Sequence, residues 1–326
     1  MTARQVGGPY FDELEVGQVF GTAPGCTLTQ GRAAQHQAIV GDRWRLALDD
    51  HLAREVAGAP LVSPALVWNV AIGQSTLATQ RVRANLFYRR LALLRQPLIG
   101  DTLRTTTTVV GLRENARREG RPPTGLAALH MKTIDQDGRP VLDFYRCAML
   151  PLSRDAGPTG RADDLDAIGA DLPPVEPTAL IPAWDRAAYV DGRTVGVLPE
   201  AGEVLEVATG DVVSSAPELA RLTLNVAAVH HDRFAAGGGQ RLVYGGHTIA
   251  IAASQLTRAL PDLATILAWE SCDHTGPVHE GDTLTTRFTV QHAAPAAGGW
   301  QVLDLRAEVT ADGERPVLDW KFSVLA

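Results

Sequence analysis

One stretch in the second half of the chain gathers side chains that can hold or move a proton. It reads Asn225-Val-Ala-Ala-Val-His230-His231-Asp232. The imidazole of His230 titrates near neutral pH, so it can act as a general acid or base. The amide of Asn225 cannot take a proton from water, but it can hold a water molecule by hydrogen bonds. The carboxylate of Asp232 can orient a histidine or cap a turn.

The adjacent histidines do not predict a metal site. Neighbouring side chains on a strand point to opposite faces, and on a helix they diverge by about 100°, so His230 and His231 are poorly placed to share one ion. The cysteines, Cys26, Cys147 and Cys272, are scattered and form no Cys-x-x-Cys pair. This spacing argues against a disulfide framework and against a zinc site. We therefore expect no metal ion and no cofactor.

A second motif, Leu242-Val-Tyr-Gly-Gly-His247, stands directly before an apolar helix. Apolar residues at i, i+4, i+7 and i+11, counted from Ile249, predict this helix over residues 246–260. The first turn of such a helix presents free N–H groups and the positive end of the helix dipole. The motif therefore predicts a place where an oxygen atom that gains negative charge could bind.

Four residues of this second motif are candidate ligand-binding residues. Gly245 and Gly246 have no Cβ atom to block the close approach of a ligand. Tyr244 can form the wall of a pocket or part of the core. His247 can line the pocket or cap the helix. Further along, His274 either approaches the same cleft or is a loop histidine.

The chain contains two copies of one pattern. Gly100-Asp101-Thr102-Leu103 recurs as Gly281-Asp282-Thr283-Leu284, 181 residues later. A Val-Leu-Asp-aromatic string begins at Val141 and again at Val317, 176 residues later. A nearly constant offset over two markers predicts two tandem copies of one domain that differ by short insertions.

Each copy predicts one buried helix and three long antiparallel strands. A Thr- and Val-rich strand follows each Gly-Asp, and an Asp-Gly turn precedes each last strand. In the first copy, Ser63-Pro64 begins the helix. The predicted middle and last strands are residues 126–134 and 141–150 in the first copy and residues 300–310 and 317–325 in the second. A long helix wrapped by a curved antiparallel sheet, made twice, is an α+β tandem (double) hotdog fold.

The copies are separated by a segment rich in Pro, Gly, Asp and Ala, which predicts a linker across the surface. We place an N-terminal hotdog at residues 1–152, the linker at 153–185 and a C-terminal hotdog at 186–326. The first copy keeps His36 but has no Asn-to-His or Asp-to-His spacing like that of the second. We expect the first copy to be catalytically degenerate and to shape a pocket.

Composition limits the class of protein. The 326 residues are 45% hydrophobic and 21% charged, with a formal net charge of −7, which is ordinary for a globular protein. The sequence has no basic tract, which argues against nucleic-acid binding. No apolar run approaches the roughly 20 residues that span a bilayer, and the first ten residues lack the apolar core of a signal peptide. We therefore expect a cytoplasmic protein that binds neither nucleic acid nor membrane.

With these residues in view, the chain resembles the MaoC-like hydratases. The opening Tyr10-Phe-Asp-Glu-Leu-Glu-Val-Gly-Gln-Val-Phe20 is similar to the start of that family. The Val-Tyr-Gly-Gly-His string and the spacing from Asn225 to His230 are the most specific parts of the resemblance, which covers nearly the whole chain. Within the family, the branch of mesaconyl-CoA hydratases, also called β-methylmalyl-CoA dehydratases, is the most similar.

The resemblance implies a hydro-lyase that adds water to a 2-enoyl thioester or removes it. The family motif Asp-x-Asn-Pro-x-His places its histidine on His230 and its leading Asp on Asn225. Its Asn and Pro fall on Ala227 and Ala228, so the chain departs from the motif there. The acidic residue after the histidine is Asp232, and the glycine that opens the helix is Gly245. Replacement of the Asp by Asn225 weakens the expectation of a two-base mechanism.

The expected substrate is a short branched or dicarboxylic acyl-CoA such as mesaconyl-CoA, with coenzyme A entering as part of the substrate. Three alternatives stay open: a dehydratase that acts on a carrier-protein-bound, polyketide or fatty acyl group, a hotdog thioesterase, and a non-catalytic acyl-CoA-binding protein. The expected assembly is a homodimer of double-hotdog subunits. Several arginines lie close together in the sequence and are candidates for binding the coenzyme A phosphates: Arg81, Arg83, Arg89, Arg90 and Arg95. The alternative is that they form a solvent-exposed face.

Overall fold

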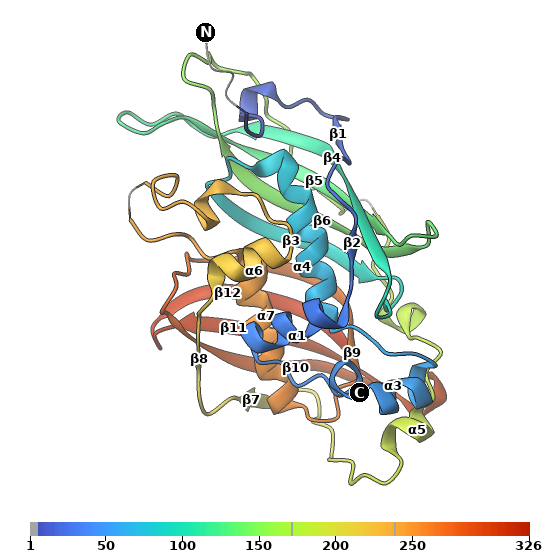
Figure 1. Ribbon diagram of the computed structural model, residues 1–326. Coiled ribbons are helices and arrows are strands. Elements are labelled where there is room, and N and C mark those ends of the chain that lie inside the picture. The colour runs from blue at the N-terminus through green and yellow to red at the C-terminus, as the bar shows by residue number, and fades with distance from the viewer. Residues whose placement is uncertain (1–5, 171, 238) are drawn as a thin grey trace.

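The computed structural model describes residues 6–170, 172–237 and 239–326. It confirms the double hotdog fold (Figure 1). Residues 1–5 of the predicted N-terminal half and residue 171 of the predicted linker lie outside the described residues. Helices and strands of the first half are η1 (Phe11–Glu13), β1 (Val19–Phe20), β2 (Cys26–Thr27), α1 (Gln30–Val40), α2 (Arg45–Leu48), α3 (Asp50–Ala57), α4 (Pro64–Ser75), η2 (Thr76–Thr79), β3 (Ala84–Leu93), β4 (Thr102–Glu114), β5 (Thr124–Ile134) and β6 (Pro140–Pro151).

After a long connection, the second half repeats the buried helix and the four long strands that follow it. Its elements are η3 (Pro177–Leu180), α5 (Arg186–Val190), β7 (Val204–Glu206), β8 (Asp211–Val212), α6 (Ala216–Leu222), η4 (Ala228–His230), α7 (Gly245–Ala259), β9 (Thr265–His274), β10 (Thr283–Pro295), η5 (Ala297–Gly299), β11 (Gln301–Ala311) and β12 (Arg315–Leu325). The strands expected at residues 126–134, 141–150, 300–310 and 317–325 are therefore present with small shifts at their ends.

The strands join into one antiparallel sheet whose order is mirrored about its centre. The first half contributes β4-β5-β6-β3, and the second half continues with β9-β12-β11-β10. The two halves meet where β3 pairs with β9, with Leu91 opposite Trp269. This pairing gives a continuous sheet, so no strand edge is left open between the halves.

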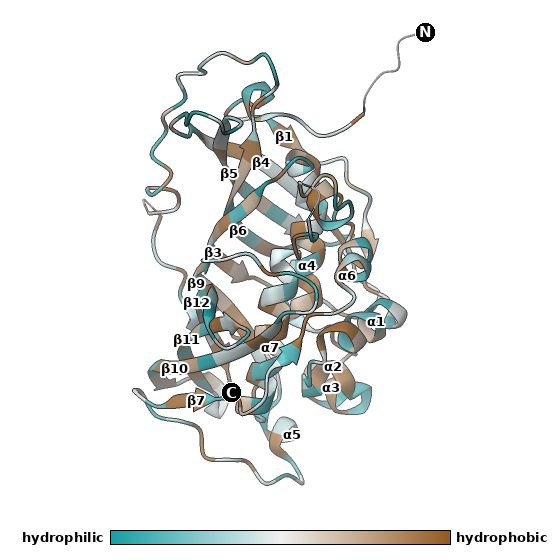
Figure 2. Cartoon of the chain, turned by 90° about the vertical axis from the view of Figure 1, so that its left-hand side faces the viewer, coloured by the Kyte–Doolittle hydropathy of each residue, from teal (hydrophilic) through white to brown (hydrophobic). Residues whose placement is uncertain are grey.

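Two helices, α4 and α7, fill the concave side of the sheet. Figure 2 shows the strands on one side of the molecule and the helices on the other. All twelve residues of α4 are buried, as are twelve of the fifteen in α7. A helix that is apolar around its whole circumference is stable only when it is covered on every side. None of the helices in the described part of the chain is both long and apolar enough to cross a membrane.

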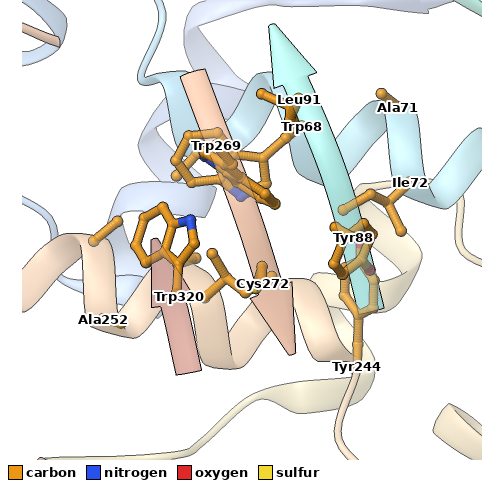
Figure 3. Close-up of a cluster of buried hydrophobic side chains, with 14 of the residues drawn as sticks. Trp68, Ala71, Ile72, Tyr88, Leu91, Tyr244, Ala252, Trp269, Cys272 and Trp320 are labelled. Carbon is orange, nitrogen blue, oxygen red and sulfur yellow. The ribbon is translucent and has the colours of Figure 1, made fainter. Parts of the chain in front are cut away.

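An aromatic cluster fixes the junction between the halves. Trp68 of α4 meets Trp269 of β9 edge-on, with 5.1 Å between the ring centroids, and Trp320 of β12 lies 5.2 Å from Trp269 in a similar arrangement. Figure 3 shows Tyr88 and Tyr244 together at one end of this cluster. Edge-to-face pairs add about 0.5–1.5 kcal/mol each to the hydrophobic gain. The cluster therefore holds α4 against the sheet of the other half.

The predicted linker is more closely packed than a surface crossing. Its described residues, 153–170 and 172–185, contain little regular structure, but Leu165 is fully buried. It packs with Leu126 and Cys147 on the outer face of the first-half sheet. This segment thus covers apolar surface, which a free linker would leave exposed to water.

A close contact joins α4 to the second half of the chain. The Cα of Gly73 packs against the backbone just before Asn225, and a Cβ atom built on Gly73 would lie 1.8 Å from the Thr223 carbonyl oxygen. Only glycine leaves room for backbone to approach this closely. A helix of the first half therefore sets the position of a segment of the second.

We expect Gly73→Ala to lower the free energy of unfolding by about 2–3 kcal/mol, because the added methyl group forces the two backbones apart. Gly157→Ala is the matched control, since a Cβ atom at Gly157 meets nothing within 4 Å. Urea unfolding of the wild type and both variants measures the effect. A Gly73→Ala protein as stable as the control would show that this contact does not constrain the fold.

Candidate active site

A cavity of about 240 Å³ lies at the junction of the two halves. The second half contributes the Asn225–His230 segment and the start of α7. The first half contributes the end of α4, η2, β3 and one residue of β6, Arg146. Four of the seven site residues expected from the sequence line this cavity, namely Asn225, His230, Tyr244 and Gly245.

His230 is held as a neutral base. Its Nδ1 lies 2.8 Å from the Leu242 carbonyl oxygen. Because a carbonyl only accepts hydrogen bonds, Nδ1 carries the proton and Nε2 keeps a free lone pair. Burial lowers the pKa of His230 to about 4, although the bond to Leu242 opposes this shift. The imidazole is therefore uncharged and ready to accept a proton at neutral pH.

Asn225 is fixed in one orientation. Its Oδ1 accepts a hydrogen bond from the Ala227 backbone N–H at 2.9 Å. The side-chain Nδ2 is buried and has no partner. Leu224, just before it, adopts the left-handed conformation with φ 62°, which turns the chain so that Asn225 faces the cavity. The amide thus offers N–H donors to a molecule bound there.

The start of α7 forms another wall of the cavity. Tyr244 precedes the helix, and its hydroxyl donates to the Asn69 carbonyl oxygen of α4 at 2.9 Å. Gly245 opens the helix and lines the cavity. The first N–H groups of a helix have no acceptor within its own turns, although the N–H of His247 donates to the Tyr244 carbonyl oxygen at 2.8 Å. A Cβ atom on Gly245 would lie 2.6 Å from Nε2 of His274. Glycine therefore leaves this wall open.

His274, the last residue of β9, also lines the cavity. Its Nε2 is buried without a partner, and its ring contacts Tyr88 edge-on at 5.9 Å. Burial lowers the pKa of His274 to about 4. The cavity thus contains two neutral imidazoles. Of the two possibilities for His274, the structure supports the one in which it approaches the cleft.

The structure does not bring three of the expected residues to the cavity. The Asp232 carboxylate is exposed and accepts from the Phe234 backbone N–H at 2.8 Å, so it caps a turn and orients no histidine. His247 is fully buried in the core, and neither ring nitrogen has a partner. At Gly246, a Cβ atom would lie 2.1 Å from Oδ1 of Asn69. The absence of a side chain there serves helix packing.

Sequence reasoning missed Arg146. The side chain stands on β6 opposite Tyr88 of β3 and faces the cavity. Its Nη2 donates to Oγ1 of Thr79 at 2.6 Å. A signal existed, because Phe144 and Arg146 are two residues apart on a strand and therefore share its buried face. An arginine on that face is unusual and calls for a functional explanation.

The first copy holds a closed counterpart of this site. Gly41 adopts φ 73°, as Leu224 does, so Asp42 stands where the second half has Asn225. Ser63 donates to the buried Asp42 carboxylate at 3.0 Å, and burial raises the pKa of Asp42 to about 6. At the position of His230 the first copy has Ala47. This half retains the turn but has no imidazole at the equivalent place.

The crowded arginines separate into two groups. Arg89 pairs with Asp273, Arg90 donates to a carbonyl of the linker, and Arg95 pairs with Asp101 and Asp135. Arg81 and Arg83 form no ion pair within the described residues. Together with Arg154 they line a second cavity of about 370 Å³, and Arg83 borders both cavities.

Two curated relatives match nearly the whole chain. Beta-methylmalyl-CoA dehydratase of Chloroflexus aurantiacus is 29% identical over 99% of this chain and 93% of its own. Mesaconyl-CoA hydratase of Cereibacter sphaeroides is 27% identical over 95% of this chain and 91% of its own. No model of a known protein family matches the chain.

Solved structures agree with these relatives. A conserved hypothetical protein of Mycobacterium tuberculosis, described as a double hotdog, is 57% identical and covers 99% of both chains with a TM-score of 0.92. A protein of Chloroflexus aurantiacus described as a MaoC domain dehydratase is 25% identical over 99% of both chains, with a TM-score of 0.85. The chain belongs to the MaoC-like double-hotdog family. As a member of this family, it is a hydro-lyase.

The low pKa of His230 predicts a broad activity profile. A general base at this place must be a neutral imidazole, and protonation removes the lone pair of His230 only as the pH falls toward about 4. We expect kcat/KM to change less than about twofold between pH 8 and pH 5.5. A histidine with an ordinary pKa would lose about tenfold over this range. Initial rates measured with circular dichroism at each pH decide between the two, and a tenfold loss in a folded protein contradicts this account.

Proposed function

We propose that this protein catalyses the reversible hydration of a 2-enoyl-CoA thioester, with a short dicarboxylic substrate such as mesaconyl-CoA. The observation that carries the proposal is the neutral imidazole of His230 beside the Asn225 amide and the open start of α7, all on one cavity. The two curated relatives, named for mesaconyl-CoA and β-methylmalyl-CoA, support the choice of substrate.

In the proposed reaction, His230 activates water. Water donates one hydrogen to Nε2 of His230 and accepts a hydrogen bond from Nδ2 of Asn225. Its remaining lone pair attacks the β-carbon of the enoyl group while the imidazole takes the proton. An O–C bond forms, an O–H bond breaks, and the electron pair of the double bond moves to the thioester oxygen.

The developing oxyanion needs donors, and the first N–H groups of α7 supply them. The positive end of the helix dipole favours charge at this place, and one such donor lowers the barrier by about 3–4 kcal/mol. The imidazolium of His230 then returns its proton to the α-carbon, which restores the thioester carbonyl and the neutral base. One acid–base residue thus balances the reaction, so no carboxylate is needed at position 225.

The adjoining cavity suits the rest of coenzyme A. Arg81, Arg83 and Arg154 line it without forming an ion pair within the described residues, although Arg81 donates to the Gly8 carbonyl oxygen and Arg83 to that of Ala235. Guanidinium binds phosphate with two parallel hydrogen bonds. Because Arg83 borders both cavities, a thioester in the first can place its phosphates over the second. We therefore assign phosphate binding to Arg81, Arg83 and Arg154.

The composition of the cavity favours hydration over thioester hydrolysis. A hotdog thioesterase would use a carboxylate, or a water held by one, to attack the carbonyl. No Asp or Glu is among the described residues that line the cavity. The alternative remains measurable, since hydrolysis releases a free thiol and hydration does not.

We expect His230→Ala to lower kcat/KM for 2-enoyl-CoA hydration at least about 100-fold, the usual loss when a general acid–base is removed. His292→Ala is the control, because that histidine is exposed on β10. The decrease in enoyl-thioester absorbance gives the rate, and thermal unfolding reports whether the variant folds. A folded His230→Ala protein that keeps activity within a few-fold would refute the assignment.

In the same assay, Asn225→Asp tests the water-holding role. The carboxylate can keep the bond from Ala227 and accept a hydrogen bond from the same water, so we expect activity within about tenfold of the wild type. Complete loss of turnover in a folded Asn225→Asp protein would show that Asn225 does something else.

A further inference from the structure

Arg146 carries a buried charge that the protein itself does not neutralise. Only 3% of its surface is exposed. Its Nη2 donates to Thr79 and, at 3.4 Å, to the Ser75 carbonyl oxygen, while Nε has no partner. No carboxylate of the described residues forms an ion pair with it. A buried guanidinium without an anion is unfavourable, because its loss of hydration is not compensated.

Other arginines with limited exposure form ion pairs with carboxylates, which Arg146 does not. Arg95 forms ion pairs with Asp101 and Asp135, and Arg193 forms one with Asp262. Among the described residues, the groups that accept hydrogen bonds from Arg146 are hydroxyl and carbonyl oxygens, and burial lowers the pKa of its guanidinium. These neighbours therefore orient the guanidinium group of Arg146 without neutralising its charge.

The fold does not require an arginine at this place. The string that begins at Val141 corresponds to the one that begins at Val317, so Arg146 is equivalent to Phe322. Phe322 is buried and stacks on Trp320 with 3.8 Å between centroids. Phe322 stands on the second copy, so that copy has an apolar core residue at the place where the first copy directs Arg146 into the cavity that also contains His230.

The position of the charge limits where its anion can lie. Arg146 lines the same 240 Å³ cavity as His230 and stands directly opposite Tyr88 on the neighbouring strand. Because both side chains line one cavity of about 240 Å³, they lie on the walls of the same small space. An anion bound by Arg146 is therefore close to the carbon that receives the hydroxyl group.

We propose that Arg146 binds a carboxylate on the acyl chain of the substrate, attached at or next to the β-carbon. The substrate class is then a short 2-enedioyl thioester, and Arg146 is a specificity-determining residue. Nη and Nε of one guanidinium can hold both oxygens of a carboxylate, which adds direction as well as charge. This inference rests on the proposed function, since it assigns the acyl end of the same ligand.

The test compares ligands with and without a carboxylate on the acyl chain, in the wild type, Arg146→Met and Arg146→Lys. Mesaconyl-CoA and crotonyl-CoA report turnover, while the saturated succinyl-CoA and butyryl-CoA report binding by calorimetry. For Arg146→Met we expect at least about 100-fold lower kcat/KM with mesaconyl-CoA and at least about 30-fold weaker succinyl-CoA binding. Values for crotonyl-CoA and butyryl-CoA stay within about threefold, and Arg146→Lys recovers part of the loss.

A structural role gives a different pattern. If Arg146 supported the fold or the oxyanion, Arg146→Met would lower Tm or reduce turnover of both enoyl substrates equally, and this result would overturn the proposal. We expect Tm to be unchanged or higher, because an unpaired buried charge is removed. If the wild type hydrated neither substrate, the proposed function would fail, whereas selective binding of succinyl-CoA through Arg146 would still support the carboxylate site.

Discussion

The whole site depends on the packing of α4 and α7 side by side beneath one continuous sheet. Each helix is buried on nearly every side, so neither can shift without opening a core. Gly73 brings α4 against the backbone that leads to Asn225, and the Tyr244 hydroxyl ties the start of α7 to Asn69 of α4. The cavity thus exists only because the two tandem copies form one core. The second copy contributes Asn225 and His230, and the first copy contributes most of the opposite wall.

Burial gives this cavity its electrostatic character. Desolvation keeps His230 and His274 neutral, which makes an imidazole into a base at physiological pH. The same desolvation makes the unpaired charge of Arg146 costly until an anion arrives. A low-dielectric cavity with a neutral base and one strong cation is suited to a ligand that brings its own negative charge. The two copies are not equivalent here, because Phe322, which corresponds to Arg146, is a core residue.

Much of the fold was predictable from the sequence because the repeat constrains it. The offset between Val141 and Val317 located corresponding strands, and the glycine pair located the start of α7 to within one residue. The segment from Asn225 to Gly245 was also identified as one group of residues, since its spacing is local. Each of these features is encoded within a short stretch of chain, where strand and helix periodicity act directly.

What the sequence did not reveal depends on packing between distant segments. Asp232 is only two residues from His230, yet it caps a turn, because backbone carbonyls already bind both neighbouring histidines. His247 follows the glycine pair but points into the core. Arg146 lies 84 residues before His230, and only the pairing of β6 with β3 brings it to the same cavity.

The most direct test of the central claim is isotopic. Purified protein is incubated with mesaconyl-CoA in water labelled with oxygen-18, and the thioester product is analysed by mass spectrometry. The account predicts an intact thioester that has gained one labelled water, with the label in a hydroxyl group on the β-carbon. Label in a free carboxylic acid together with released coenzyme A, or an unchanged substrate across short 2-enoyl thioesters, would contradict it.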